Sequence, residues 1–122
     1  MVHSGGFAVH EMGVVFHVIS RLEDLAKEQE LTEISSVTLR IGEVSGILND
    51  MLADCFSWAV KKTEVLKNAT LTIEEIPALT YCEDCGELYP TVANGKICPH
   101  CGSEHTYLYQ GNEFEIKEIE AC

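Results

Sequence analysis

The residues 81–86, Tyr-Cys-Glu-Asp-Cys-Gly, and 98–102, Cys-Pro-His-Cys-Gly, decide how this chain folds. They contain two C-x2-C knuckles separated by twelve residues, whose cysteines are Cys82, Cys85, Cys98 and Cys101. Two residues between ligands let one tight turn present both sulfurs to a single ion, so the spacing predicts a tetrahedral four-thiolate metal site. The glycine after each knuckle lacks the Cβ that would crowd such a turn.

Four sulfur ligands close the coordination shell of the predicted site. This closure favours structural zinc, as in a zinc ribbon, where metal binding supplies folding energy that so short a segment lacks. It leaves no open position for water or substrate, which disfavours catalysis by the ion. Iron in a rubredoxin-like site also fits the knuckles and stays open as an alternative. We expect His100 and His105 to be surface residues beside the metal loop, because the shell is already filled; the alternative is that one of them replaces a cysteine if the site rearranges.

Composition restricts the class of protein. The 122 residues suffice for one ordinary domain, or for a small domain with a metal-stapled module. Eight basic and 20 acidic residues give a formal charge of −12, which argues against a nucleic-acid partner. No apolar run reaches the roughly 20 residues of a membrane span, and the N-terminus does not resemble a secretion signal. Cysteines in metal spacing further indicate a reducing compartment, so we expect a cytoplasmic protein without membrane association.

Hydrophobic periodicity predicts the order of the elements. Residues 1–8 contain Ser-Gly-Gly and are predicted to be a leader or a disordered extension. The remaining predicted elements are a helix over 11–29, a strand around 37–41, a helix capped by Asn49 or Asp50 and running to about residue 67, a strand from residue 70 that stops at Pro77, the cysteine module over 81–109 and a strand from residue 114.

This order of elements predicts an α+β fold. Two amphipathic helices would cover one face of a small three-stranded sheet and bury both apolar stripes there. The four-cysteine, zinc-ribbon-like domain, residues 80–109, would be inserted between the last two strands, which we expect to be neighbours. The α+β domain would comprise residues 9–79 plus 110–122.

The pair His10-Glu11 is a weak signal by itself, and a solvated helix start is the simplest interpretation, with Glu11 at the positive end of the helix dipole. The pair predicts a metal site if translation starts at the codon of Val9, read as methionine. A free amine, backbone amide nitrogens and the imidazole of His10 would then surround one ion in a plane, a geometry that suits Ni(II) or Cu(II). In the printed chain, the amine, two amides and His3 form a generic chelate of the same kind.

These residues together resemble the HypA/HybF family of nickel metallochaperones, which act in [NiFe]-hydrogenase maturation. The resemblance runs from about residue 9 to residue 119 and rests on His10-Glu11-Met12, on Arg40-Ile41-Gly42-Glu43, on both knuckles and on Gln110-Gly111-Asn112-Glu113. It implies a carrier that is not an enzyme, with Ni²⁺ as cargo and a separate structural Zn²⁺ site. It also implies a GTPase partner, the hydrogenase large subunit as destination, and urease maturation as a second role. Both a monomer and a homodimer are compatible with it.

The resemblance places the nickel ligands in the α+β domain, at His10 and Glu11. The family sometimes adds a carboxylate from the loop after the first strand. No acidic residue stands at the aligned position here, so Asp50 is only a loose candidate. Two other functions stay open: a zinc-ribbon interaction module without nickel chemistry, and a rubredoxin-like iron electron carrier. The first predicts a basic binding face, which does not suit this acidic chain.

Overall fold

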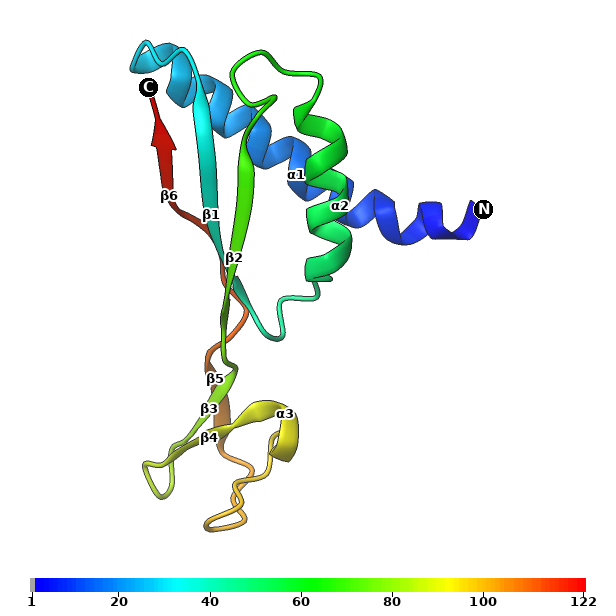
Figure 1. The fold of residues 1–122 in the computed structure, drawn as a ribbon. Coiled ribbons are helices and arrows are strands. Elements are labelled where there is room, and N and C mark those ends of the chain that lie inside the picture. Colours follow the sequence, from blue (N-terminus) through cyan, green and yellow to red (C-terminus); the bar gives the residue numbers. More distant parts are fainter. Residues whose placement is uncertain (1) are drawn as a thin grey trace. The chain divides into compact units, whose positions relative to one another are not determined.

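The computed structural model describes the backbone of residues 2–122 and the side chains of residues 10–122. Figure 1 shows the helices and strands of the fold. The strands form two three-stranded sheets, with strand orders β2-β1-β6 and β4-β3-β5. The elements are α1 (Val2–Glu28), β1 (Ile34–Gly42), α2 (Asn49–Val60), β2 (Thr70–Ile76), β3 (Leu79–Cys82), β4 (Leu88–Pro90), α3 (Thr91–Asn94), β5 (Thr106–Gln110) and β6 (Phe114–Ala121). The predicted α+β class with an inserted four-cysteine module is confirmed.

The chain divides into two compact units. One comprises Met1–Leu39, Ile47–Ile73 and Ile116–Cys122, and the other comprises Arg40–Gly46 and Glu74–Glu115. The four cysteines lie in the second unit. The domain boundaries predicted at residues 79–80 and 109–110 stay predictions, as does the leader over residues 1–8. The side chain of His3 lies outside the described residues.

The core of the first unit is formed by the two long helices and the strand segments beside them. Helices α1 and α2 pack against each other. The apolar stripe predicted on the first helix is confirmed, since its members are at most 6% exposed. The buried residues of this core are Val15, Val18, Ile19, Leu22 and Ala26 on α1, Ile34, Val37 and Leu39 on β1, and Leu52, Cys55, Phe56, Ala59 and Val60 on α2.

One predicted end of each helix was wrong: the start of the first and the end of the second. Helix α1 begins at Val2 rather than near Glu11. Helix α2 ends at Val60, and the hydroxyl of Thr63 explains why: it donates to the Val60 carbonyl at 3.1 Å and accepts from the Leu66 N–H at 3.2 Å. A threonine that bonds the backbone in this way offers the chain an alternative to the helical ladder. Leu66 still reaches the core, but from the turn after the helix.

The predicted pairing of the last two strands was also wrong, because β1 lies between β2 and β6. The burial of the strands explains the order. Four apolar residues of β1 are at most 1% exposed, whereas β2 and β6 are mostly exposed and rich in charged residues, as sheet edges commonly are. Arg40 on the central strand lies between the two edges. Its guanidinium is 4.0 Å from Glu74 on β2 and 3.0 Å from Glu115 on β6.

Two glycines in the second unit allow backbones to meet at close range. A Cβ on Gly42 would lie 2.0 Å from the Gly111 carbonyl oxygen, and a Cβ on Gly111 would lie 2.5 Å from the Ala78 Cα. The Gly42 N–H donates to the Glu113 carbonyl, and the Val44 N–H donates to the Gly111 carbonyl, both at 2.8 Å. Both glycines belong to the motifs that carry the family resemblance. These motifs therefore bring backbone segments that are distant in sequence into close contact.

Among the residues that the structure describes, no helix is both long and apolar enough to cross a membrane.

Candidate metal centres

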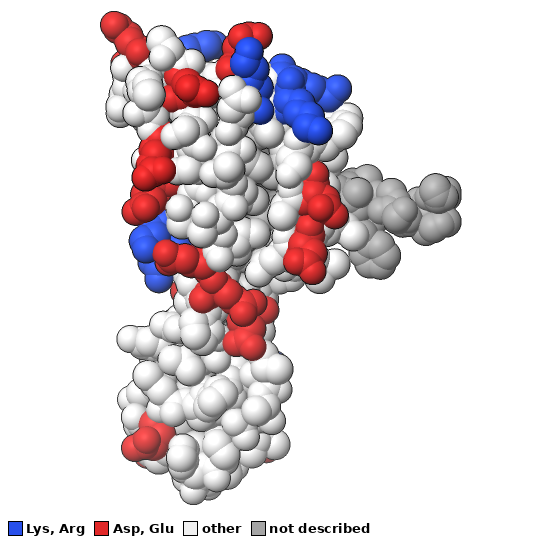
Figure 2. All heavy atoms as spheres, viewed as in Figure 1, with Lys and Arg blue, Asp and Glu red and all other residues white. Residues whose placement is uncertain are grey.

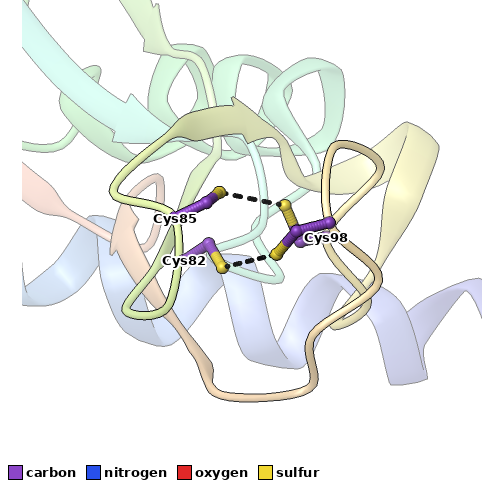
Figure 3. Close-up of side chains that lie close together, drawn as sticks. Cys82, Cys85 and Cys98 are labelled. Atoms are coloured by element: carbon purple, nitrogen blue, oxygen red, sulfur yellow. Dashed lines mark hydrogen bonds between the residues drawn. The ribbon is translucent and has the colours of Figure 1, made fainter.

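The four knuckle cysteines converge on one point in the second unit. Figure 3 shows the side chains of Cys82, Cys85 and Cys98 pointing toward one another; Cys82 ends β3, Cys85 lies in the turn after it, and Cys98 lies in the loop that precedes β5. The Sγ atoms of Cys82 and Cys101 are 3.6 Å apart, as are those of Cys85 and Cys98. All four Sγ atoms lie within 4.8 Å of one another.

These distances suit one tetrahedral ion. A Zn–S distance of about 2.3 Å places neighbouring sulfurs of a regular tetrahedron about 3.8 Å apart, close to the observed spacing. Within the described part of the chain, this is the one group of three or more histidine, cysteine or acidic side chains that could hold a metal ion. The structure therefore brings together all four residues that the sequence predicted as ligands.

Both knuckles have the same local geometry. In each, the N–H of the first cysteine donates to a carbonyl five residues later, from Cys82 to Glu87 and from Cys98 to Ser103, both at 3.0 Å. The glycine N–H returns to the carbonyl of that cysteine at 2.8 Å. The φ angles of Gly86 and Gly102 are 76° and 75°. Residues with a Cβ rarely adopt this left-handed conformation, so the backbone favours glycine at both positions. The predicted reason was wrong: a Cβ on Gly102 would meet nothing within 4 Å, and one on Gly86 would meet only the Tyr81 hydroxyl at 3.9 Å.

A very small apolar core surrounds the sulfurs. Cys82, Cys98 and Tyr89 form a buried cluster, and each is at most 2% exposed. The Tyr89 hydroxyl donates to the Gly95 carbonyl at 2.9 Å, which satisfies its polar end. Burial of one aromatic ring cannot offset the conformational entropy of ordering the module, so an ion bound by the four sulfurs would supply much of its stability.

The thiols differ in acidity. The backbone N–H of Cys85 lowers the pKa of Cys82 to about 7, with help from the Asp84 N–H and against the opposing effect of burial. For Cys85, the Glu87 N–H acts to lower the pKa, but burial and the neighbouring thiols outweigh it and raise the pKa to about 12. One thiolate therefore forms readily, whereas a second charge beside it is disfavoured unless a cation compensates it.

Neither histidine near the knuckles belongs to the sulfur cluster. His100 is exposed, and its backbone N–H donates to the Cys98 Sγ at 3.4 Å. His105 is exposed too, and its Nδ1 lies 3.2 Å from the Asp84 carboxylate. A hydrogen bond from the Ser103 hydroxyl and the nearby His105 lower the pKa of Asp84. The sequence did not predict this contact between the two knuckles; its only signal was that Asp84, Ser103 and His105 stand inside or just after them.

The residues predicted to bind nickel lie in the first unit, and they differ in exposure. His10 is exposed on α1, and Asp50 is exposed in the first turn of α2. Glu11 is only 2% exposed, and its Oε2 accepts the Leu48 N–H at 3.1 Å, just before α2 begins. The predicted solvated position of Glu11 at the start of its own helix was therefore wrong. Its carboxylate instead faces the positive end of the other helix, where negative charge is favoured.

The predicted cap of α2 was wrong as well. Leu48 occupies the N-cap position, and no side chain caps the helix there. The Asn49 Oδ1 is buried and has no hydrogen-bond partner among the described residues. Cys55 lies on the buried face of the same helix, and burial, Glu11 and Asp54, in that order, raise the pKa of its thiol. The Glu11 carboxylate accepts the N–H of the N-cap residue Leu48, so α2 receives a negative charge at its start from another helix and no side-chain cap of its own.

Comparisons with known proteins agree on one family. The family described as hydrogenase/urease nickel incorporation, metallochaperone, hypA, matches residues 9–121. The hydrogenase maturation factor HypA of Albidiferax ferrireducens is 31% identical over 112 residues, which are 92% of this chain and 98% of that protein. The HypA of Streptomyces avermitilis is 34% identical over 91% of this chain and 86% of its own. The solution structure of the Ni metallochaperone HypA from Helicobacter pylori matches with a TM-score of 0.67 and 28% identity, over 91% of this chain and 96% of that one.

Proposed function

The chain belongs to the HypA family of nickel metallochaperones, which serve hydrogenase maturation, and from this premise we propose that it carries Ni²⁺ at His10 and holds Zn²⁺ in its four-cysteine cluster. The observation that carries the proposal is the closure of that cluster. Four sulfurs fill a tetrahedral shell and bind the ion tightly, which suits a structural metal and does not suit a cargo that must be released. The deliverable ion therefore binds elsewhere.

The exposed imidazole of His10 is the best nickel ligand of the first unit. Imidazole and backbone nitrogens in a plane match the preference of Ni(II) for square-planar ligation, and an exposed site can exchange its ion. Glu11 and Asp50 are the further candidates. Because Glu11 already accepts the Leu48 N–H, its first role is to hold that backbone against α1, and nickel would share its remaining lone pairs.

Zinc is the structural ion that the thiolate set favours. Its d¹⁰ configuration imposes no geometry of its own and accepts the tetrahedron that the two knuckles build. When bound, the ion supplies the positive charge that lets all four thiols ionise together. The metal content and the absorption spectrum of the purified protein test this choice. One zinc per chain and a colourless protein would support it, whereas a red protein containing iron would support the rubredoxin-like alternative.

The partners follow from the family. We propose a GTPase that loads or accepts the nickel, and the hydrogenase large subunit as its destination. The family is described by nickel incorporation into both hydrogenase and urease, which supports urease maturation as a second role. In this role the chain acts as a cytoplasmic carrier and catalyses no reaction itself.

The nickel site is tested with two versions of the chain. One is the printed sequence with His3→Ala, which removes the generic chelate at its N-terminus. The other begins with methionine in place of Val9. Nickel binding is measured by calorimetry and by the Ni(II) absorption spectrum after zinc loading. We expect the shorter version to bind nickel tightly, and we expect His10→Ala in that version to abolish nickel binding.

His17→Ala is the matched control, since His17 is a second exposed histidine on the same helix. It should leave nickel binding unchanged. Glu11→Gln keeps an oxygen that accepts the Leu48 N–H but removes the negative charge, so it separates a ligand role from a positioning role. Undiminished nickel affinity in His10→Ala would overturn the assignment of His10.

A further inference from the structure

The end of helix α2 carries an exposed patch formed by Trp58, Lys61 and Lys62. Trp58 is the one tryptophan of the chain, and it is 52% exposed. Lys61 is the C-cap residue and keeps helical dihedral angles, and the Lys62 N–H donates to the Ala59 carbonyl at 3.2 Å, so the chain continues to turn through both lysines. Residues three and four apart on a helix are neighbours on its surface. The three side chains therefore share one face, which we call the lysine–tryptophan patch.

This patch is basic, although the chain as a whole is acidic. Residues 55–73 contain three lysines and one acidic residue, Glu64. Of the eight basic and 20 acidic residues in the chain, this leaves five basic and 19 acidic residues elsewhere. Figure 2 shows basic side chains gathered beyond the end of α2, whereas acidic side chains lie along the earlier part of that helix. The patch therefore attracts negative charge that most of the chain repels.

Neither lysine of the patch is neutralised within the part of the chain whose side chains the structure describes. Lys61 and Lys62 form no ion pair there. By contrast, the third lysine of the segment, Lys67, lies 3.6 Å from Glu64. The Lys62 Nζ lies 4.5 Å from the centre of the Trp58 ring, which is a cation–π contact. The negative end of the helix dipole accounts for lysines at this position, but it does not account for the exposed indole ring.

We propose that the lysine–tryptophan patch docks an acidic segment of a partner protein. Carboxylates of this segment pair with Lys61 and Lys62, and an apolar side chain packs on the Trp58 ring. Tryptophan is enriched among the residues that contribute most to protein interfaces, and a cation–π pair strengthens when water is removed from it. Small ligands bind in concave sites, whereas the outer face of a helix end is convex. Nucleic acid would be repelled by the carboxylates elsewhere on the chain.

Asp54 sets the direction of the docked segment. It is exposed on α2, four residues before Trp58, and therefore lies one turn away on the same side of the helix. Its carboxylate repels the acidic side chains of the partner, so these lie toward Lys61 and Lys62 rather than toward the start of α2. Docking does not require nickel at His10, because no residue of the patch is a candidate nickel ligand.

The single tryptophan allows docking to be measured directly. The probe is a synthetic peptide with blocked ends, Asp-Glu-Leu-Phe-Glu-Glu, and the control peptide has Asn and Gln in place of Asp and Glu. Each is titrated at low salt into the zinc-loaded chain without nickel, and Trp58 emission and calorimetry report binding. We expect the acidic peptide to shift the emission to shorter wavelength and to bind at least about tenfold more tightly than the neutral peptide. Raising the ionic strength to about 0.15 M should weaken its binding.

Paired substitutions separate the patch from the general effect of charge. The double variant Lys61→Gln, Lys62→Gln should bind the acidic peptide at least about tenfold more weakly, and so should Trp58→Ala when followed by calorimetry. The matched control is Lys67→Gln, Lys96→Gln, which removes the same charge from two exposed lysines outside the patch and should stay within about twofold of the native chain. Circular dichroism and zinc content check that each variant is folded.

Four outcomes would overturn the proposal. The acidic peptide could fail to bind, or the two double variants could weaken its binding equally. A single-stranded oligothymidylate that binds the patch as tightly as the peptide would show that charge alone is recognised. A shift of Trp58 emission with the concentration of the chain alone would show that a second copy occupies the patch. Because nickel is absent from these titrations, their failure is separate from a failure of nickel binding at His10.

Discussion

Replacing Gly42 by alanine introduces one methyl group where two backbone segments touch. The new Cβ would lie 2.0 Å from the Gly111 oxygen, 2.1 Å from the Gly111 carbon and 2.5 Å from the Asn112 nitrogen. All three are backbone atoms, so no side chain can rotate away. Restoring an ordinary contact of 3.4 Å to the Gly111 oxygen requires the two segments to separate by about 1.4 Å.

The free-energy cost follows from what this separation breaks. Two hydrogen bonds of 2.8 Å, from the Gly42 N–H to the Glu113 carbonyl and from the Val44 N–H to the Gly111 carbonyl, join the segments. Each contributes about 1 kcal/mol. Overpacking adds about 1–3 kcal/mol of strain. We therefore expect Gly42→Ala to lower the free energy of unfolding by about 3–5 kcal/mol, a large part of the ~5–15 kcal/mol typical of a domain.

Urea unfolding of the zinc-loaded protein, followed by circular dichroism, measures this loss. Gly13→Ala is the matched control: a Cβ there meets nothing within 4 Å, and the residue is exposed inside α1. Alanine is favoured over glycine in a helix by about 0.8–1.0 kcal/mol, so the control should be more stable than the native chain. A Gly42→Ala protein within about 1 kcal/mol of the native one would refute the close backbone approach.

Three further predictions concern single side chains. Burial raises the pKa of the Cys55 thiol, so iodoacetamide at pH 8 should modify Cys55 much more slowly than the exposed Cys122. Peptide mass spectrometry measures both rates of modification. Comparable rates would contradict the burial of Cys55. Because this pKa is raised from 9.0, the neutral thiol favours the fold below about pH 9, and that contribution is lost as the pH rises through the raised value. Thr63→Val removes the hydroxyl that accepts the Leu66 N–H and should destabilise the protein by about 1–3 kcal/mol, measured by thermal unfolding. The control Thr63→Ser keeps the hydroxyl, so its stability should be close to that of the native chain. Cys82→Ser should release zinc to a chromogenic chelator at a concentration where Cys122→Ser retains it, and retention of zinc by both variants would argue against the cluster as the zinc site.

The sequence predicted most, but not all, of the features that depend on short stretches of chain. The glycine at each knuckle was foreseen because the turn lies within five residues, although the structure requires it through φ angles of 76° and 75° rather than through the crowding that was predicted. The buried stripe of α1 was foreseen because its members recur at helical spacing. The end of α2 was missed, although its cause is local. The Thr63 hydroxyl bonds the Val60 carbonyl and the Leu66 N–H, and apolar periodicity does not detect such hydrogen bonds.

The arrangement of distant segments was decided by tertiary structure alone. The sequence did not indicate that β1 would separate β2 from β6, because strand order depends on pairing between strands that lie far apart in the chain. Nor did it indicate that Glu11 would be buried and accept the N–H of Leu48, which is 37 residues away. The four cysteines lie between these two cases. Their spacing within each knuckle determined the ligand pairs, whereas the pairing of β3 with β5 brings the two pairs together in the tertiary structure.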